Sequence, residues 1–115
     1  MKRLFLDTNI LVDLICHRTP FVEEAEQLFA LAYIGRIGIG VSALSFINTV
    51  YIAKKYNYQA NEVISKLKEL TSFITITHLT ETTIEQAIDC GWNDFEDAVQ
   101  YYSSQPFSAD YIITR

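Results

Sequence analysis

Two hydrophobic patterns alternate along this chain: short apolar or β-branched runs typical of buried strands, and the 3.6-residue spacing of amphipathic helices. The strand-like runs lie at 4–6, 37–41, 73–77 and 109–114. Helical spacing predicts helices directly behind residue 7, from about 19 to 35, over 42–56, around 60–67, over 82–91 and over 93–104. Strands separated by helices favour parallel pairing through right-handed crossovers. The pattern therefore predicts an α/β fold, a three-layer α/β/α domain around a central parallel sheet.

Composition places the chain among globular proteins. It has 115 residues, half of them hydrophobic and 20% charged, so we expect one domain, 1–115, with its own core. The formal net charge of −5 weighs mildly against non-specific nucleic-acid binding. Cys16 and Cys90 lack the CxxC spacing of a zinc site and are expected to be free thiols in a reducing cytosol. No uncharged apolar run approaches the roughly 18 residues that span a bilayer, so we expect a cytoplasmic protein and no membrane partner.

The first candidate for chemistry is Asp7, which follows the first predicted strand at once. In α/β folds the carboxyl ends of the strands form the edge where ligands usually bind. Aspartate is also a favoured helix N-cap, and a helix is predicted directly behind it. Taken alone, Asp7 is explained by capping.

A second group of acids lies in the helix predicted from Asn93. Its apolar stripe consists of Phe95, Ala98, Val99 and Tyr102. At about 100° per residue, Asp94 and Asp97 lie on the flank of that stripe, whereas Glu96 and Gln100 are predicted to point away. The helix dipole explains Asp94. The like charge of Asp94 beside Asp97 favours a bound cation, and Mg²⁺ or Mn²⁺ suits carboxylate oxygens.

Three segments together carry a family resemblance. They are Leu-Asp-Thr-Asn at 6–9, Asp-Phe-Glu-Asp-Ala at 94–98 and Ala-Asp-Tyr-Ile-Ile-Thr-Arg at 109–115. In this order and spacing the chain resembles, over its whole length, the PIN-domain nucleases, whose prokaryotic members include the VapC-type toxins. The resemblance implies a central parallel sheet with acids gathered at its carboxyl edge.

The resemblance also implies roles for individual residues. Asp7, Asp94 and Asp97 would be catalytic, with Asp7 and Asp97 as direct ligands of Mg²⁺ or Mn²⁺. Asn9 would orient Asp7, and Thr114 would face the site from the end of the last strand. The implied activity is a metal-dependent endoribonuclease that hydrolyses RNA phosphodiester bonds. The implied partners are the RNA substrate, an antitoxin protein and a second copy in a homodimer.

Two positions depart from the family pattern. Active members usually carry a glutamate early in the third helix, where this chain has Asn48. Asn48 lies between Leu44 and Ile52 and is predicted to point inward, either as a hydrogen-bonded core residue or as a neutral substitute at the site. Family members also continue past the Ile-Thr-Arg segment with a further aspartate, a helix and a strand. We therefore expect a C-terminally truncated domain that lacks its final helix and strand, with weak metal binding and negligible RNA cleavage by these 115 residues.

Two other readings are open. A PIN-fold module that binds RNA or protein with little hydrolysis is favoured by Asn48 and by the acidic net charge. A phosphoryl-accepting domain with Asp7 as nucleophile fits poorly, because no aspartate stands two residues after Asp7 and no lysine closes the last strand.

Overall fold

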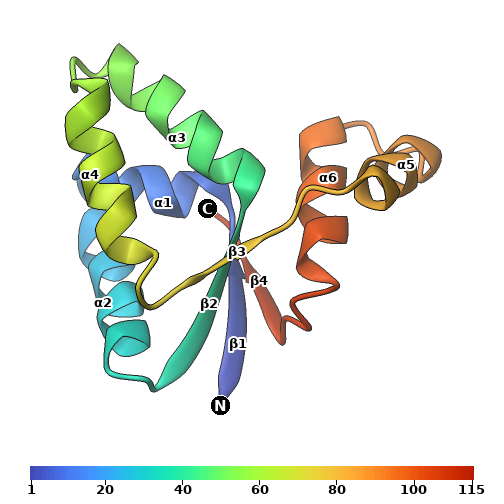
Figure 1. The fold of residues 1–115 in the computed structure, drawn as a ribbon, viewed down its shortest axis with the longest axis horizontal. Helices are drawn as coiled ribbons and strands as arrows, with labels where there is room; N and C mark the ends of the chain where they lie inside the picture. The colour runs from blue at the N-terminus through green and yellow to red at the C-terminus, as the bar shows by residue number, and fades with distance from the viewer.

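The computed structural model describes residues 1–115 and contains a four-stranded parallel sheet with helices on both faces (Figure 1). The strands are β1 (Lys2–Leu6), β2 (Ile37–Ser42), β3 (Thr75–Thr77) and β4 (Tyr111–Ile113). Their order is β3-β2-β1-β4, and each neighbouring pair is parallel. The predicted parallel α/β sheet is confirmed.

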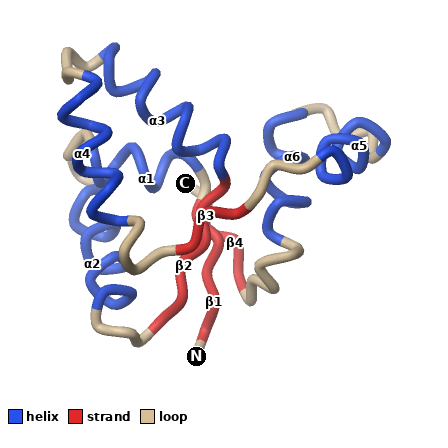
Figure 2. The backbone as a smooth tube through the Cα atoms, viewed as in Figure 1, coloured by secondary structure: helices blue, strands red, loops and turns tan.

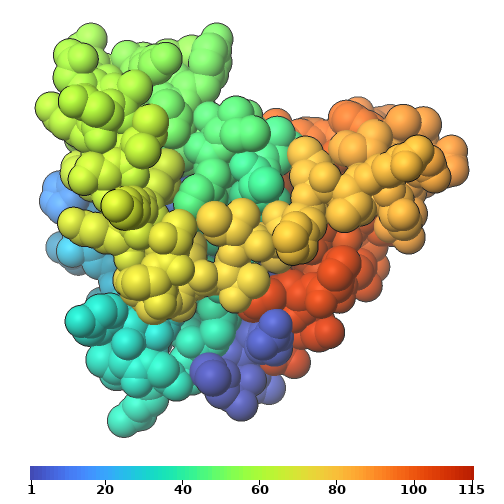
Figure 3. Space-filling view, viewed as in Figure 1, coloured from blue at the N-terminus to red at the C-terminus, as the bar shows by residue number.

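Six helices cover this sheet in two layers. They are α1 (Thr8–Ile15), α2 (Val22–Tyr33), α3 (Ala43–Lys55), α4 (Ala60–Leu70), α5 (Glu81–Asp89) and α6 (Phe95–Ser104). Figures 1 and 2 show α1 to α4 on one side of the strands and α5 with α6 on the other. In the space-filling view of Figure 3, the segment that leaves α4 crosses the front of the molecule through β3 towards α5. This arrangement is the predicted three-layer α/β/α domain.

The two helical layers bury different amounts of apolar surface. The larger cluster lies under α1 to α4 and contains 16 buried residues, among them Leu11, Phe29 and Leu67. The cluster formed by α5 and α6 has only three buried members, Ala87, Ala98 and Val99. Apolar burial is the main driving force of folding, so the α1–α4 side carries most of the stability. The α5–α6 side has room for polar contacts between α6 and the rest of the fold.

The connection from α6 to β4 is fixed against the sheet by Arg3, Phe107 and Gly40. The Arg3 guanidinium lies 4.0 Å from the centre of the Phe107 ring, and its Nε donates to the Phe107 carbonyl at 2.7 Å. A Cβ atom on Gly40 would come within 2.8 Å of that ring. Glycine in β2 therefore lets the chain pass close to the sheet before it enters β4.

Helix ends differ from the predicted ones by a few residues. Thr19 and Pro20 were expected to start α2, but that helix starts at Val22, and its N-cap Phe21 makes no side-chain hydrogen bond. The helix predicted over 82–91 is α5, which starts at Glu81, and its capping hydroxyl is Thr80, whose Oγ1 accepts from the Thr83 amide at 3.2 Å. Alternative caps two residues apart offer nearly the same hydrogen bond, so the pattern does not separate them.

Two further observations concern the cysteines and the lengths of the helices. Cys16 and Cys90 are both free. None of the six helices has the length and apolar character that crossing a membrane would require.

Candidate active site

Two of the candidate acids are helix N-caps at the carboxyl edge of the sheet. Asp7 directly follows β1, and its Oδ1 accepts from the Ile10 amide at 3.3 Å. Asp94 starts α6 in the same way, with Oδ1 accepting from the Asp97 amide at 3.1 Å. An N-cap carboxylate satisfies an amide that has no partner within the helix. Both side chains are therefore held in place by the start of the helix that follows them.

Asp7, Asp94 and Asp97 line one pocket of about 220 Å³. No hydrophobic residue contributes to its wall, which is completed by Thr8, Asn9, Glu96 and Gln100. Residues separated by nearly ninety positions are thus brought together by β1 and α6. Their predicted catalytic and metal-binding roles stay predictions, which the placement makes testable.

The pocket wall carries negative charge without a basic residue in it, and the Arg115 charge acts on Asp7 only from outside the wall. Four carboxylates line it, and no lysine or arginine does. The two salt bridges of the structure both involve Asp13, which lies outside this pocket. Burial raises the pKa of Asp7, while the backbone amides of Ile10, Arg115 and Asn9 lower it to a smaller extent. Like charges in one pocket attract a cation.

The prediction that Glu96 and Gln100 point away from the site is wrong. Both line the pocket, and Gln100 is only 7% exposed. Phe95, which was assigned to the buried stripe, is 49% exposed. Because the α5–α6 layer has little apolar surface to cover, α6 turns a polar side towards α1 and α3. The rule that apolar residues face the core therefore predicts the wrong rotation of α6 about its own axis, by part of a turn.

A buried polar network forms the floor of the pocket. The Gln100 carboxamide donates through Nε2 to Ser45 Oγ at 2.8 Å and to Thr8 Oγ1 at 3.2 Å. Thr8 Oγ1 and Ser45 Oγ lie 2.8 Å apart, and Ser42 Oγ donates to Ser45 Oγ at 3.2 Å. Gln100 Oε1 is buried and has no hydrogen-bond partner. Buried polar groups nearly always have partners, so this oxygen is an exception.

The sequence contained a signal for this floor that pattern analysis did not use. On α6, Gln100 is followed at one helical turn by Ser103 and Ser104, and all three are buried. On α3, Ser45 and Thr49 are buried on one side in the same way. Of these buried hydroxyls only Ser45 joins the two helices, through its contact with Gln100, because Thr49 and Ser104 bond to carbonyls of their own helices.

Asn48 lies at the rim of the pocket rather than in the core. It is half-buried on α3, and its Nδ2 donates to Glu96 Oε1 at 3.0 Å. Its hydrogen-bond partner is an acid of the pocket and not a core group. The role of Asn48 as a neutral substitute for a glutamate stays a prediction.

Thr114 and Asn9 do not make the contacts predicted for them. Thr114 lines a different pocket, together with Asp13 and Arg115. β4 ends at Ile113, whose carbonyl accepts from the Asp7 amide at 3.1 Å, so Thr114 follows the last paired residue. Asn9 lines the acidic pocket, but its Oδ1 accepts from Arg18 Nη2 at 3.4 Å. The Asn9 group that acts on Asp7 is the backbone amide.

The donor set of the pocket fits a hard, hydrated cation. No three histidine, cysteine or carboxylate side chains converge closely enough to form a ready-made metal cage. Mg²⁺ usually keeps several waters and is held by one or two carboxylates, and Mn²⁺ prefers the same oxygen ligands. A wide pocket with four carboxylates and an unpartnered amide oxygen matches that pattern.

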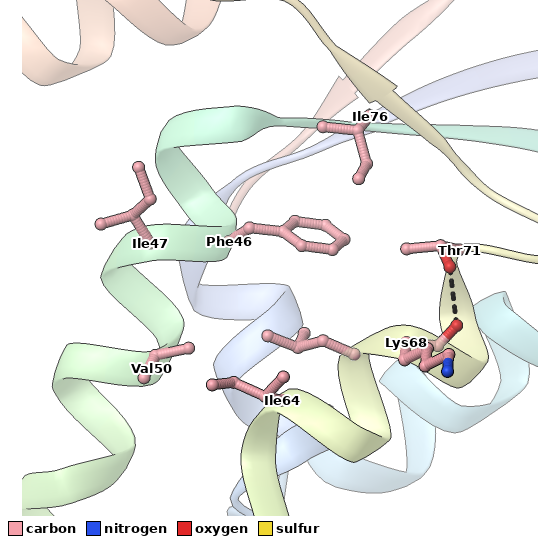
Figure 4. A pocket seen from close by; sticks show the side chains of 8 residues that line it. Phe46, Ile47, Val50, Ile64, Lys68, Thr71 and Ile76 are labelled. Carbon is pink, nitrogen blue, oxygen red and sulfur yellow. Dashed lines mark hydrogen bonds between the residues drawn. The ribbon is translucent and has the colours of Figure 1, made fainter. Parts of the chain in front are cut away.

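A second, larger pocket of about 470 Å³ lies between α3, α4 and β3. Figure 4 shows Phe46 of α3 and Ile64 of α4 on facing sides of it, with Lys68 and Thr71 near its edge. Its wall is mostly hydrophobic and contains no carboxylate. It offers no ligands for a metal ion, so the chemistry is placed at the acidic pocket.

Comparison with known proteins identifies the family. A family model described as "PIN domain" matches residues 3–115, and the chain belongs to that family. A comparison with curated protein sequences gives no match.

Similar solved structures support the same fold. The Mycobacterium tuberculosis toxin VapC20, described as cleaving the sarcin–ricin loop, superposes with a TM-score of 0.76 at 17% identity, covering 97% of this chain and 88% of that one. A toxin–antitoxin complex from Klebsiella pneumoniae gives 0.67 at 23% identity, covering 96% and 84%. VapBC2 from Rickettsia felis, bound to a promoter DNA fragment, gives 0.65 at 18% identity, covering 96% and 86%. At these identities the likeness shows the PIN fold.

Proposed function

We propose that this protein is a metal-dependent endoribonuclease of the VapC toxin type, which hydrolyses RNA phosphodiester bonds in the cytoplasm. The observation that carries the proposal is the pocket at the carboxyl edge, lined by four carboxylates without a basic partner. Membership of the PIN domain family and the likeness to a sarcin–ricin loop cleaving toxin support it.

In this proposal Asp7 and Asp97 would be the residues that hold Mg²⁺ or Mn²⁺. A bound divalent cation supplies an activated water and stabilises charge on the scissile phosphate. Asp94 is fixed by its capping bond, and its Oδ2 has no protein partner, so it can accept a hydrogen bond from the attacking water. The network of Thr8, Ser45 and Gln100 keeps α1, α3 and α6 in register beneath these acids.

The proposal includes two protein partners. An antitoxin would mask the acidic pocket, and a second copy would form a homodimer. The Klebsiella pneumoniae neighbour is a toxin–antitoxin complex and the Rickettsia felis neighbour is VapBC2, which supports an antitoxin partner.

The alternative is a PIN-fold module that binds RNA or protein without hydrolysis. It is favoured by the lack of a ready-made metal cage and by Asn48 at the position of the family glutamate. Cleavage and binding can be measured separately, so one experiment distinguishes the two functions.

The test is cleavage and binding of an RNA pool with Mn²⁺, with EDTA, and with the variant Asp7→Asn. Asparagine keeps the N-cap and removes the charge. Cleavage by these 115 residues is expected to be slow, Mn²⁺-dependent and abolished by EDTA, and Asp7→Asn should bring it to the level of the EDTA sample. Asp89→Asn, an exposed change on α5, is the matched control and should cleave like the wild type. RNA binding without cleavage, unaffected by EDTA or by Asp7→Asn, would establish the binding module instead.

A further inference from the structure

The resemblance to the family implies a glutamate early in the third helix, and this chain has Asn48 there. The structure places a different carboxylate beside that position. Glu96 of α6 lines the acidic pocket, and its Oε1 accepts from Asn48 Nδ2 at 3.0 Å. The nearest acid to position 48 is thus supplied by another helix.

The contact between Asn48 and Glu96 is one of two contacts that set α3 and α6 in register. One turn earlier on α3, Ser45 Oγ accepts from Gln100 Nε2 at 2.8 Å, and Gln100 lies one turn later on α6. Residues three or four apart lie on one face of a helix, so each helix presents a single face to the other. The position of Glu96 is therefore set by a buried contact one turn away as well as by its own hydrogen bond.

Holding Glu96 beside three other acids costs electrostatic free energy, and no ion pair in the folded chain offsets it. Glu96 shares the pocket with Asp7, Asp94 and Asp97, and none of the four forms an ion pair. An exposed glutamate next to like charges would gain by turning into solvent. Asn48 instead holds it with a neutral donor, which leaves its charge in place and its Oε2 without a protein partner.

A second feature of the same pocket points to a ligand. Gln100 is 7% exposed, lines the pocket, and has an Oε1 with no hydrogen-bond partner. A buried acceptor of this kind costs free energy unless something donates to it. A hydrated cation in the pocket would neutralise the carboxylates and bring water donors next to the side of Gln100 that lines the pocket.

We propose that Glu96 is the fourth carboxylate of the cation site and that Asn48 is its positioning residue. In this chain α6 supplies the acid that α3 supplies in the family pattern. The inference rests on the proposed function, because it assigns residues to the metal site of that nuclease.

The test measures Mn²⁺ affinity by titration calorimetry on the intact chain, without any RNA. Glu96→Gln should weaken binding by about 10-fold, whereas Glu85→Gln, an exposed change on α5, should leave the affinity unchanged. Asn48→Ala should weaken binding by about 3-fold in the wild type and have no further effect beside Glu96→Gln. A merely structural asparagine would act equally in both backgrounds.

Moving the charge gives a second measurement. The double variant Asn48→Glu with Glu96→Gln places the acid back on α3 and the amide on α6, with the same net charge. We expect its Mn²⁺ affinity to return to within about 3-fold of the wild type, because ligand charge largely sets the affinity for a hard cation. Circular dichroism of each variant confirms that the fold is retained.

The outcomes separate this inference from the proposed function. Wild-type affinity in Glu96→Gln, with binding abolished in Asp7→Asn, would overturn the role of Glu96 and leave the nuclease proposal standing. If the wild type bound no Mn²⁺, both the role of Glu96 and the proposal of a metal-dependent nuclease would be overturned. An equal effect of Asn48→Ala in both backgrounds would overturn the positioning role alone.

Discussion

Helix α1 carries two aspartates whose surroundings are opposite. Asp13 is 1% exposed and is held by two arginines: Arg18 Nε lies 2.8 Å from Oδ1, and Arg115 contacts both oxygens at 2.7 Å. Asp7, at the start of the same helix, has no ion pair and shares a pocket with three other acids. A buried carboxylate is tolerated when it is paired and hydrogen-bonded. Ion pairing therefore explains the buried charge of Asp13, whereas capping explains where Asp7 and Asp94 stand but not why four acids share one pocket.

The paired region also has a structural task. Arg115 reaches Asp13 across 102 positions of sequence and stacks on the Phe21 ring at 3.8 Å. Arg18 extends from Asp13 to the Asn9 carbonyl at 3.1 Å. These contacts hold the segment after β4, through Arg115, against α1 and α2. The region of α1 around Asp13 stabilises the fold through its ion pairs. Asp7, at the start of the helix, has a carboxylate without an ion pair.

The largest expected effect tests the paired region. Asp13→Asn removes the charge that faces two arginines and leaves their guanidinium groups short of an acceptor. Because both arginines are partly open to solvent, we expect a loss of about 3 kcal/mol in the free energy of unfolding, at the lower end for a broken buried pair. Urea denaturation followed by circular dichroism measures it.

Asp89→Asn on exposed α5 serves as the control for Asp13→Asn and should change the same free energy by less than about 0.5 kcal/mol. Equal effects of the two substitutions would mean that Asp13 is not the fastening residue.

A smaller effect is expected beneath the acidic pocket. Gln100→Met keeps the length of the side chain but removes the donor to Ser45 and Thr8. The two hydroxyls still contact each other, so we expect a loss of about 1 to 2 kcal/mol in the same denaturation measurement. Gln86→Met at an exposed position of α5 should be nearly neutral. A gain in stability would show that the unpartnered Oε1 outweighs both hydrogen bonds.

The smallest effect has the opposite sign and concerns Asp7. Burial raises its pKa in the folded state, so ionised Asp7 opposes folding at pH values above that raised pKa. In EDTA at pH 7, Asp7→Asn should therefore increase stability by less than about 1 kcal/mol while keeping the cap.

The pH dependence sharpens this prediction for Asp7. Below the ordinary aspartate pKa of about 3.9 the carboxyl is protonated in both states, and the gain should vanish. Thermal unfolding across pH 3 to 8 measures this difference. If Asp7→Asn lowered the stability at pH 7, the Asp7 carboxylate would stabilise the fold as Asp13 does, and the contrast between the two aspartates would be wrong.

Much of the fold follows from residue patterns. The short apolar runs lie at β1 and β2 almost residue for residue, and Ser42 caps α3 as expected, with Oγ accepting from the Ser45 amide. Gly35 ends α2 with a φ of +79°, a conformation that glycine adopts without strain. These features depend on neighbours in sequence, which is why local rules find them.

The site was only partly predictable because its contacts join distant elements. Asp7, Asp94 and Asp97 were found from their positions at element ends. Glu96 and Gln100 were assigned to the wrong side of α6, since the rule that apolar residues point inward fails where a helix docks through hydroxyl groups. No local pattern indicates that Asn48 meets Glu96 from another helix.

The capping bonds of Asp7 and Asp94 have a consequence for conformational entropy. Each carboxylate is already restricted to one side-chain rotamer before any ligand arrives, because its Oδ1 is bonded to a helix amide. Ordering a free side chain on binding costs about 0.5 to 1.5 kcal/mol, and these two acids avoid much of that loss. Glu96 has more rotatable bonds and is held by one exposed hydrogen bond. It therefore loses more side-chain conformational entropy on cation binding than either aspartate does. Cation binding should accordingly quench motion mainly at Glu96 and leave the two capping aspartates nearly as rigid as before.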